Sequence, residues 1–252
     1  MIGASPECRR IVPSVPKRVS SLIPRSRAVG PPGRRQDDGM RTWIGADVSA
    51  TSLHGVEIDR GGSVIDVCEI AADELFRFVD WARRAEVVAV DAPAQLSMGA
   101  HRSDPDLAPK YQAARCAEVA LGREHRVWVP WVTPEAFPEA GWIRVGLRLF
   151  AELRDAGKDA IEVFPYAGFR LLAGGSPLPK KTSRAGRARR IELLGKAGIR
   201  ERTMPAWGHD ALDAALAALI AQGRSLGGSF RVGCGHDDSA IWLPAKLHVS
   251  PS

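Results

Sequence analysis

The chain has 252 residues, of which 45% are hydrophobic, so it can bury a substantial core and is expected to be globular. Its formal net charge of +6 arises within residues 1–41, which hold nine basic and three acidic side chains, so the rest of the chain is formally neutral. No stretch approaches the roughly 18 consecutive apolar residues of a membrane span, and we expect no membrane partner.

Residues 1–40 contain six prolines and show neither a helical nor an alternating apolar period, which predicts a disordered basic extension before one domain over 41–252. The segment is rich in Arg and Ser, as transit peptides are, but lacks the apolar stretch of a secretory signal. Met40 stands directly before the first predicted strand. Two other interpretations stay open, a misassigned translation start and a nucleic-acid-binding arm.

The four cysteines, Cys8, Cys68, Cys116 and Cys234, lie far apart and form no Cys-x-x-Cys pair. Disulfide frameworks and thiolate zinc sites usually show closely spaced cysteines, so neither is expected. A reducing cytoplasm is therefore the expected location.

Three strands are predicted at the start of the domain, in RTWIGADVS, LHGVEID and SVIDVCEI, with Gly61-Gly62 turning the chain between the last two. DELFRFVDWARR has the apolar spacing of a helix, and Asp73 is its expected N-cap. EVVAVDAP is nearly continuous in apolar residues, which is typical of a strand covered on both faces. The order β-β-β-α-β indicates an α/β fold with a mixed sheet flanked by helices.

After Asp91 the pattern loosens into a loop, a helix over about 110–121, the aromatic and Pro-rich RVWVPWVTPEAFPEAGW, and a helix over about 143–156. AIEVFP is the fifth predicted strand, so this region is a helical and loop insertion between strands four and five. Helices over about 184–197 and 211–222 and a terminal hairpin turning near 235–238 complete the domain.

Carboxylates stand where packing alone would not place them. Asp47 lies inside the first strand, and Asp91 ends the fourth, at the edge where open α/β sheets bind ligands. Glu162 interrupts the fifth strand, and Asp210 and Asp213 begin the helix in HDALDAALAAL, three residues apart on one face. Each acid also has an ordinary interpretation, because aspartates cap helices and turns.

Convergence of these acids would require a cation, because like charges at close range raise one another's pKa and cost energy. Oxygen ligands without a nearby Cys or His cluster suit Mg²⁺ or Mn²⁺. Two such ions about 4 Å apart can activate a water and stabilise the leaving oxygen of a phosphodiester. The acids therefore predict metal-dependent hydrolysis.

Seven segments, taken in order, resemble the domain-of-unknown-function family 429, which is described as predicted nucleases of RNase H-like fold and is distantly similar to Holliday-junction resolvases. The segments are WIGADVS, VVAVDAPAQLS, ARCAEVAL, TPEAFPEAGW, IEVFPYAGF, LPKKTSRAGRARRIELL and HDALDAALAAL. The resemblance covers about residues 42–244. It implies an RNase H-like mixed five-stranded sheet in the order 3-2-1-4-5, with strand 2 antiparallel to the others.

The resemblance also implies roles for individual residues. Four acids take the positions of metal ligands and catalytic groups around a pair of Mg²⁺ or Mn²⁺ ions: Asp47, Asp91, Asp210 and Asp213. Arg115 and Glu118 match an Arg-x-x-acid motif on the helix after strand four, and Glu162 matches a Glu-x-x-Pro strand. Both glutamates are included among the catalytic candidates.

Basic side chains gather after residue 179. The candidates for binding nucleic acid are Arg115, Lys180, Lys181, Arg184, Arg187 and Arg190. Cations beside an acidic metal site suit a phosphate backbone, although a solvated helix face has the same composition. His209 is a candidate proton shuttle, or else a structural residue before the helix.

Four aromatic residues of the Pro-rich stretch, Trp128, Trp131, Phe137 and Trp142, either stack nucleobases or pack into the core, and core packing is the favoured interpretation. Three histidines, His101, His125 and His236, have no matched partners and stay unassigned.

The leading hypothesis is a divalent-metal-dependent nuclease with DNA or RNA as its partner. A catalytically silent nucleic-acid-binding scaffold is one alternative. A phosphotransferase or nucleotide hydrolase of the actin-like type is another, against which stands the lack of a Gly-rich phosphate loop after the first strand. The sequence leaves the oligomeric state open, with a homodimer as one alternative.

Overall fold

One mixed sheet of five strands forms the centre of the protein in the computed structural model, which describes residues 41–245. The strands are β1 (Thr42–Val48), β2 (Ser52–Asp59), β3 (Val64–Ala71), β4 (Val87–Asp91) and β5 (Asp159–Glu162). Their order is β3-β2-β1-β4-β5, with β2 antiparallel to both neighbours and β1, β4 and β5 parallel. The predicted strand order 3-2-1-4-5 is confirmed, whereas the predictions for residues 1–40 lie outside the described residues.

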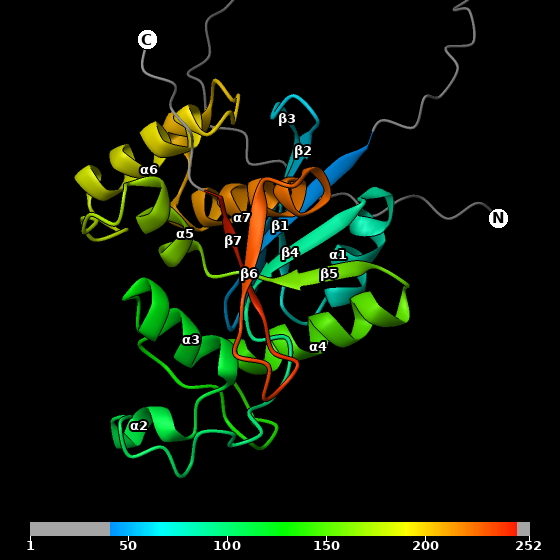
Figure 1. Ribbon diagram of the computed structural model, residues 1–252. Helices are drawn as coiled ribbons and strands as arrows, with labels where there is room; N and C mark the ends of the chain where they lie inside the picture. Colours follow the sequence, from blue (N-terminus) through cyan, green and yellow to red (C-terminus); the bar gives the residue numbers. More distant parts are fainter. Residues whose placement is uncertain (1–40, 246–252) are drawn as a thin grey trace, which may run out of the picture.

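Helix α7 (His209–Leu226) lies across one face of the sheet (Figure 1). It packs against the β1 backbone at Gly45, where an added Cβ would come within 2.0 Å of the Ala214 carbonyl oxygen. The Ala-rich face of α7, including Ala214 and Ala218, is fully buried. This close approach brings the first turns of α7 near the carboxyl ends of β1 and β4.

The opposite face of the sheet is covered by α1 (Leu75–Trp81) and α4 (Trp142–Asp155). Phe78 and Leu149 are buried there against Ile44. The prediction of Asp73 as the N-cap of α1 is wrong. The helix begins at Leu75, its N-cap residue is Glu74, and no side chain makes a capping hydrogen bond.

The insertion between β4 and β5 contains α2 (Pro109–Gln112) and α3 (Cys116–His125) before α4. The helix predicted over 110–121 is therefore two helices, because the chain turns at Ala113 and is extended at Arg115, the N-cap residue of α3. Helices α5 (Pro165–Leu172) and α6 (Arg184–Lys196) follow β5, and Figure 1 shows both on the side of the sheet that carries α7. Helix α5 was not expected from the sequence.

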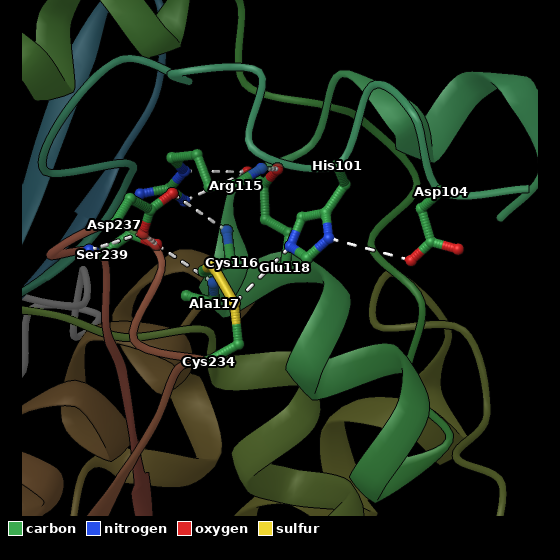
Figure 2. The surroundings of a disulfide bond; sticks show 9 residues. All are labelled: His101, Asp104, Arg115, Cys116, Ala117, Glu118, Cys234, Asp237 and Ser239. Carbon is green, nitrogen blue, oxygen red and sulfur yellow. Dashed lines mark hydrogen bonds and ion pairs between the residues drawn. A yellow bond between two sulfur atoms is a disulfide. The ribbon is translucent and has the colours of Figure 1, made fainter. Parts of the chain in front are cut away.

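The predicted terminal hairpin is confirmed as β6 (Ser229–Val232) and β7 (Ile241–Pro244). Its connection returns to the N-terminus of α3, where Cys234 forms a disulfide with Cys116 across 118 residues of sequence (Figure 2). The expectation of no disulfide is wrong. Such a separation leaves no local signal, because only the fold brings the two cysteines together.

None of the helices described between residues 41 and 245 has the length and apolar character of a membrane span.

Candidate metal and nucleic-acid site

Two aspartates face each other at the carboxyl edge of the sheet. In the parallel β1–β4 ladder, Asp47 is the register partner of Asp91, so both side chains point to the same face. Each of the two side chains affects the pKa of the other. Asp213 and Asp210, from the first turns of α7, also act electrostatically on Asp47. The sheet and one helix thus bring together all four predicted metal ligands.

Burial and like charge disturb the ionisation of these acids. Burial, followed by the charge of Asp213, raises the pKa of Asp47 to about 7. Burial, followed by the charges of Asp47 and Asp213, raises the pKa of Asp91 well above its usual value. The cluster therefore carries more negative charge than its surroundings neutralise, and a bound cation would relieve this excess.

Two basic side chains enter the acidic cluster. Lys181 Nζ lies 3.0 Å from Asp213 Oδ2 and 4.0 Å from Asp210 Oδ1. Arg190 is buried against the Phe169 ring, with its Nε 3.8 Å from Asp213 Oδ1. Asp213 is thus already paired with cations, whereas neither Asp47 nor Asp91 forms an ion pair within residues 41–245.

A pocket of about 810 Å³ opens above the acids. Lys180, Lys181 and Arg190 line one part of it. Five aromatic residues also line it: Trp128, Trp131, Trp142, Phe164 and Tyr166. A volume of this size is typical of ligand sites in proteins.

The aromatic residues divide into packed and exposed members. Trp131 packs edge-on against Trp142 and Phe164, at 5.0 Å between ring centroids in each case. Trp128 and Tyr166 remain 40% and 39% exposed at the pocket. The core-packing interpretation therefore describes Trp131 well, whereas Trp128 and Tyr166 present surface to a ligand.

The profile of the family described as "Protein of unknown function (DUF429)" matches residues 41–237. The chain belongs to this family. Among solved structures, the chain is similar to "T. thermophilus RuvC in complex with Holliday junction substrate", with 15% identity, a TM-score of 0.36, and coverage of 74% of this chain and 96% of that chain. No curated protein sequence matches.

Three of the predicted residues lie elsewhere in this DUF429 protein. Glu162 is the register partner of Val90, one residue before Asp91, so it points to the opposite face of the sheet from the acidic cluster. It accepts two hydrogen bonds of 2.6 Å from Arg115. Arg115 also donates to Glu118 at 3.0 Å, and Glu118 accepts from the Thr133 hydroxyl.

This second cluster is closed to ligands. Arg115 is 1% exposed, Glu118 is fully buried and Glu162 is 5% exposed. The associated cavity measures only about 10 Å³. Arg115 therefore has no surface for a phosphate backbone, and the two glutamates cannot reach a substrate in the larger pocket. We interpret the three as a buried ion-pair network that fixes α3 to the sheet.

The remaining basic candidates differ in position. Lys180 lines the pocket beside Lys181, whereas Arg184 and Arg187 lie on α6 outside the pocket lining. His209 Nδ1 lies against Asp210 Oδ1 at the start of α7, beside the cluster.

One residue of this DUF429 site, His54, was missed from the sequence. It is the register partner of Asp47 in the β1–β2 ladder. Ligand atoms of Asp47, His54 and Asp210 lie within 4.8 Å of one another. The Nδ1 atom of His54 is buried and has no hydrogen-bond partner within residues 41–245. The register of the first hairpin was the available signal, because cross-strand partners share a face.

Proposed function

We propose that this DUF429 protein is a divalent-metal-dependent nuclease that hydrolyses phosphodiester bonds in nucleic acid. One observation supports this proposal most strongly: four acids and two basic side chains line the same pocket. They are Asp47, Asp91, Asp210, Asp213, Lys181 and Arg190. An acidic floor suits a divalent cation, and adjacent basic side chains suit the phosphate backbone.

The donor set fits Mg²⁺ or Mn²⁺. All four acids offer hard oxygen ligands, and the raised pKa values of Asp47 and Asp91 indicate negative charge that lacks a counter-ion. Asp47 and Asp91 are the primary ligands in this proposal, because Asp213 is already paired with Lys181. When bound, a pair of such ions supplies Lewis-acid stabilisation of charge on the phosphoryl group and activates water.

The chain's own residues hold the substrate. Lys180 and Lys181 neutralise phosphates beside the acids, since both line the pocket. Trp128 and Tyr166 offer exposed rings on which a nucleobase stacks. An unpaired nucleotide fits this combination of charged floor and aromatic wall.

One observation favours a second candidate function. Lys181 and Arg190 neutralise Asp213 without a metal, as an arrangement that only binds nucleic acid would permit. In such a scaffold the basic and aromatic pocket residues bind nucleic acid and no bond is cut.

A cleavage assay separates the two functions. The full chain is incubated with Mg²⁺ or Mn²⁺ and single-stranded, duplex, hybrid and branched DNA and RNA. We expect cleavage that requires the metal, is lost in Asp47→Asn, and persists in Asp155→Asn, a matched change at an exposed acid at the end of α4. If every substrate stays uncut while labelled strands bind the protein, the scaffold function would be supported instead.

A further inference from the structure

His101, Cys116 and Cys234 lie together outside the acidic pocket. His101 follows β4 in the insertion, Cys116 is the first residue of α3, and Cys234 lies between β6 and β7. One ligand atom from each lies within 4.8 Å of the others, and His101 Nε2 is 3.5 Å from Cys234 Sγ. Figure 2 shows the imidazole directed at the two sulfurs. None of the three lines the acidic pocket, so this cluster is independent of the proposed nuclease.

Hydrogen bonds between α3 and side chains of the hairpin connection keep the two cysteines near each other independently of the S–S bond. The Cys116 amide donates to Asp237 Oδ2 at 3.1 Å, and the Ala117 amide donates to Ser239 Oγ at 3.0 Å. Asp237 in turn accepts a 2.8 Å bond from the Ser239 amide. These bonds fix the hairpin connection to the N-terminus of α3 (Figure 2). After reduction the two thiols would therefore stay close.

His101 is oriented as a metal-binding histidine is. Its Nδ1 lies 4.0 Å from Asp104 Oδ2, and Arg123 Nη2 holds that same carboxylate at 2.8 Å. Ligating histidines usually direct their other ring nitrogen to a carboxylate, which fixes the tautomer and the ring. Asp104 thus leaves His101 Nε2 facing the sulfurs.

His236, two residues beyond Cys234 and outside this cluster of three, is the candidate for a fourth ligand. His236 has its ring centroid 6.2 Å from that of His101. Gly235, between Cys234 and His236, has φ +80°, in the left-handed region that lets the chain turn back on itself. Two thiolates and two imidazoles form the ligand set of structural zinc sites, which are tetrahedral and closed.

We propose that, when the disulfide is reduced, Cys116 and Cys234 bind Zn²⁺ together with His101 and His236. A dithiol reductant supplies two electrons and two protons, the S–S bond breaks, and the reductant becomes a disulfide. Zinc then replaces the two thiol protons, which pass to buffer. Disulfide and zinc are mutually exclusive states of one site.

The test uses the full chain carrying Cys8→Ser and Cys68→Ala, so that Cys116 and Cys234 are its only thiols. The protein is reduced anaerobically with dithiothreitol, freed of reductant and titrated with Co²⁺, then with Zn²⁺. We expect a thiolate-to-cobalt charge-transfer absorption that Zn²⁺ abolishes at one equivalent per chain. The oxidised protein should show neither signal.

Variants then locate the ion. Cys234→Ser, at an exposed position, should abolish the charge-transfer band, and Asp104→Asn should weaken zinc binding by about 10–100-fold. Asp155→Asn should leave the band unchanged, because Asp155 lies at the end of α4, outside both the carboxylate cluster and the cysteine cluster. Circular dichroism of each variant checks folding.

Three results would each overturn the proposal. They are a reduced protein that gives no thiolate–cobalt band, a band that survives Cys234→Ser, and a disulfide that dithiothreitol does not reduce in the folded protein.

Discussion

Asp47 and Asp91 are register partners on parallel strands, and their side chains lie on the same face at the carboxyl edge of the sheet. Burial and then the charge of Asp213 raise the pKa of Asp47, whereas burial and then the charges of Asp47 and Asp213 raise the pKa of Asp91. The charge of this pair is the least neutralised in the cluster, because Lys181 and Arg190 form ion pairs with Asp213. The negative charge of the site that lacks a counter-ion is therefore concentrated on these two residues.

The first prediction concerns the pH dependence of metal-free protein. Burial and the charge of Asp213 move the pKa of Asp47 from 3.8 to about 7, so between these pH values the folded state binds more protons than the unfolded state. The free energy of unfolding should therefore fall as pH rises through this window. Asp47→Asn should remove part of that fall and stabilise the protein at pH ~8 by ~1 kcal/mol or more.

Urea unfolding with EDTA at the two ends of the window measures this effect. Asp155→Asn is the control and should keep the wild-type slope, because it lies outside the cluster at the end of α4. Equal slopes in wild type and Asp47→Asn would show that Asp47 ionises as an ordinary surface acid.

The second prediction concerns the contact between β1 and α7. Gly45→Ala places a Cβ 2.0 Å from the Ala214 carbonyl oxygen and 2.2 Å from the Ala218 amide nitrogen, so the helix must move away from the sheet. We expect a loss of about 1–3 kcal/mol in the free energy of unfolding, and weaker metal binding. Gly195→Ala, with nothing within 4 Å of the added Cβ, is the control and should be neutral or slightly stabilising. A variant at Gly45 with wild-type stability would contradict the packing described.

The third prediction concerns the aromatic wall. Trp128→Ala should weaken binding of single-stranded nucleic acid by about 1–3 kcal/mol, because it removes an exposed ring from the pocket. Trp128→Phe should recover part of the affinity. Fluorescence anisotropy with Ca²⁺ in place of the catalytic ion measures binding without cleavage. Phe137→Ala is the control, since Phe137 is 50% exposed but outside the pocket, and equal losses in both alanine variants would argue against stacking at Trp128.

The fourth prediction concerns the buried network of Arg115, Glu118 and Glu162. Arg115→Met leaves two buried carboxylates without their cation and should cost about 3–5 kcal/mol of unfolding free energy. Arg187→Met on α6 should change stability little. Below its melting temperature the Arg115 variant should keep the metal affinity of wild type. If the Arg115 variant lost metal binding but kept normal stability, this network would instead be part of the metal site.

Parts of the site could be predicted because they follow from register. A parallel sheet delivers the last residues of neighbouring strands to one edge, so the positions of Asp47 and Asp91 sufficed to bring them together. Glu162 looked equivalent in sequence, but its pairing with Val90 rather than Asp91 turns it to the other face. A shift of one residue along a strand is enough to reverse a side chain, and strand ends read from sequence are not that accurate.

Other features could not be predicted from local patterns. Cys116 and Cys234 meet only because the terminal hairpin returns to α3, and His54 joins the acids only through the pairing of β1 with β2. Arg190 belongs to a run of basic residues that resembles a solvated face, yet it is 2% exposed and packs on Phe169. Composition gives the charge of such a helix but not which of its side chains turn inward.

Calorimetric titration of Mn²⁺ into the metal-free protein at pH ~7 tests the central claim most directly, because it reports binding without requiring the correct substrate. We predict binding accompanied by proton release from the Asp47–Asp91 pair, detected as a dependence of the heat on the buffer's ionisation enthalpy. Asp47→Asn should abolish it and Asp155→Asn should not. Absence of binding, or binding that Asp47→Asn leaves intact, would contradict a metal site at these carboxylates.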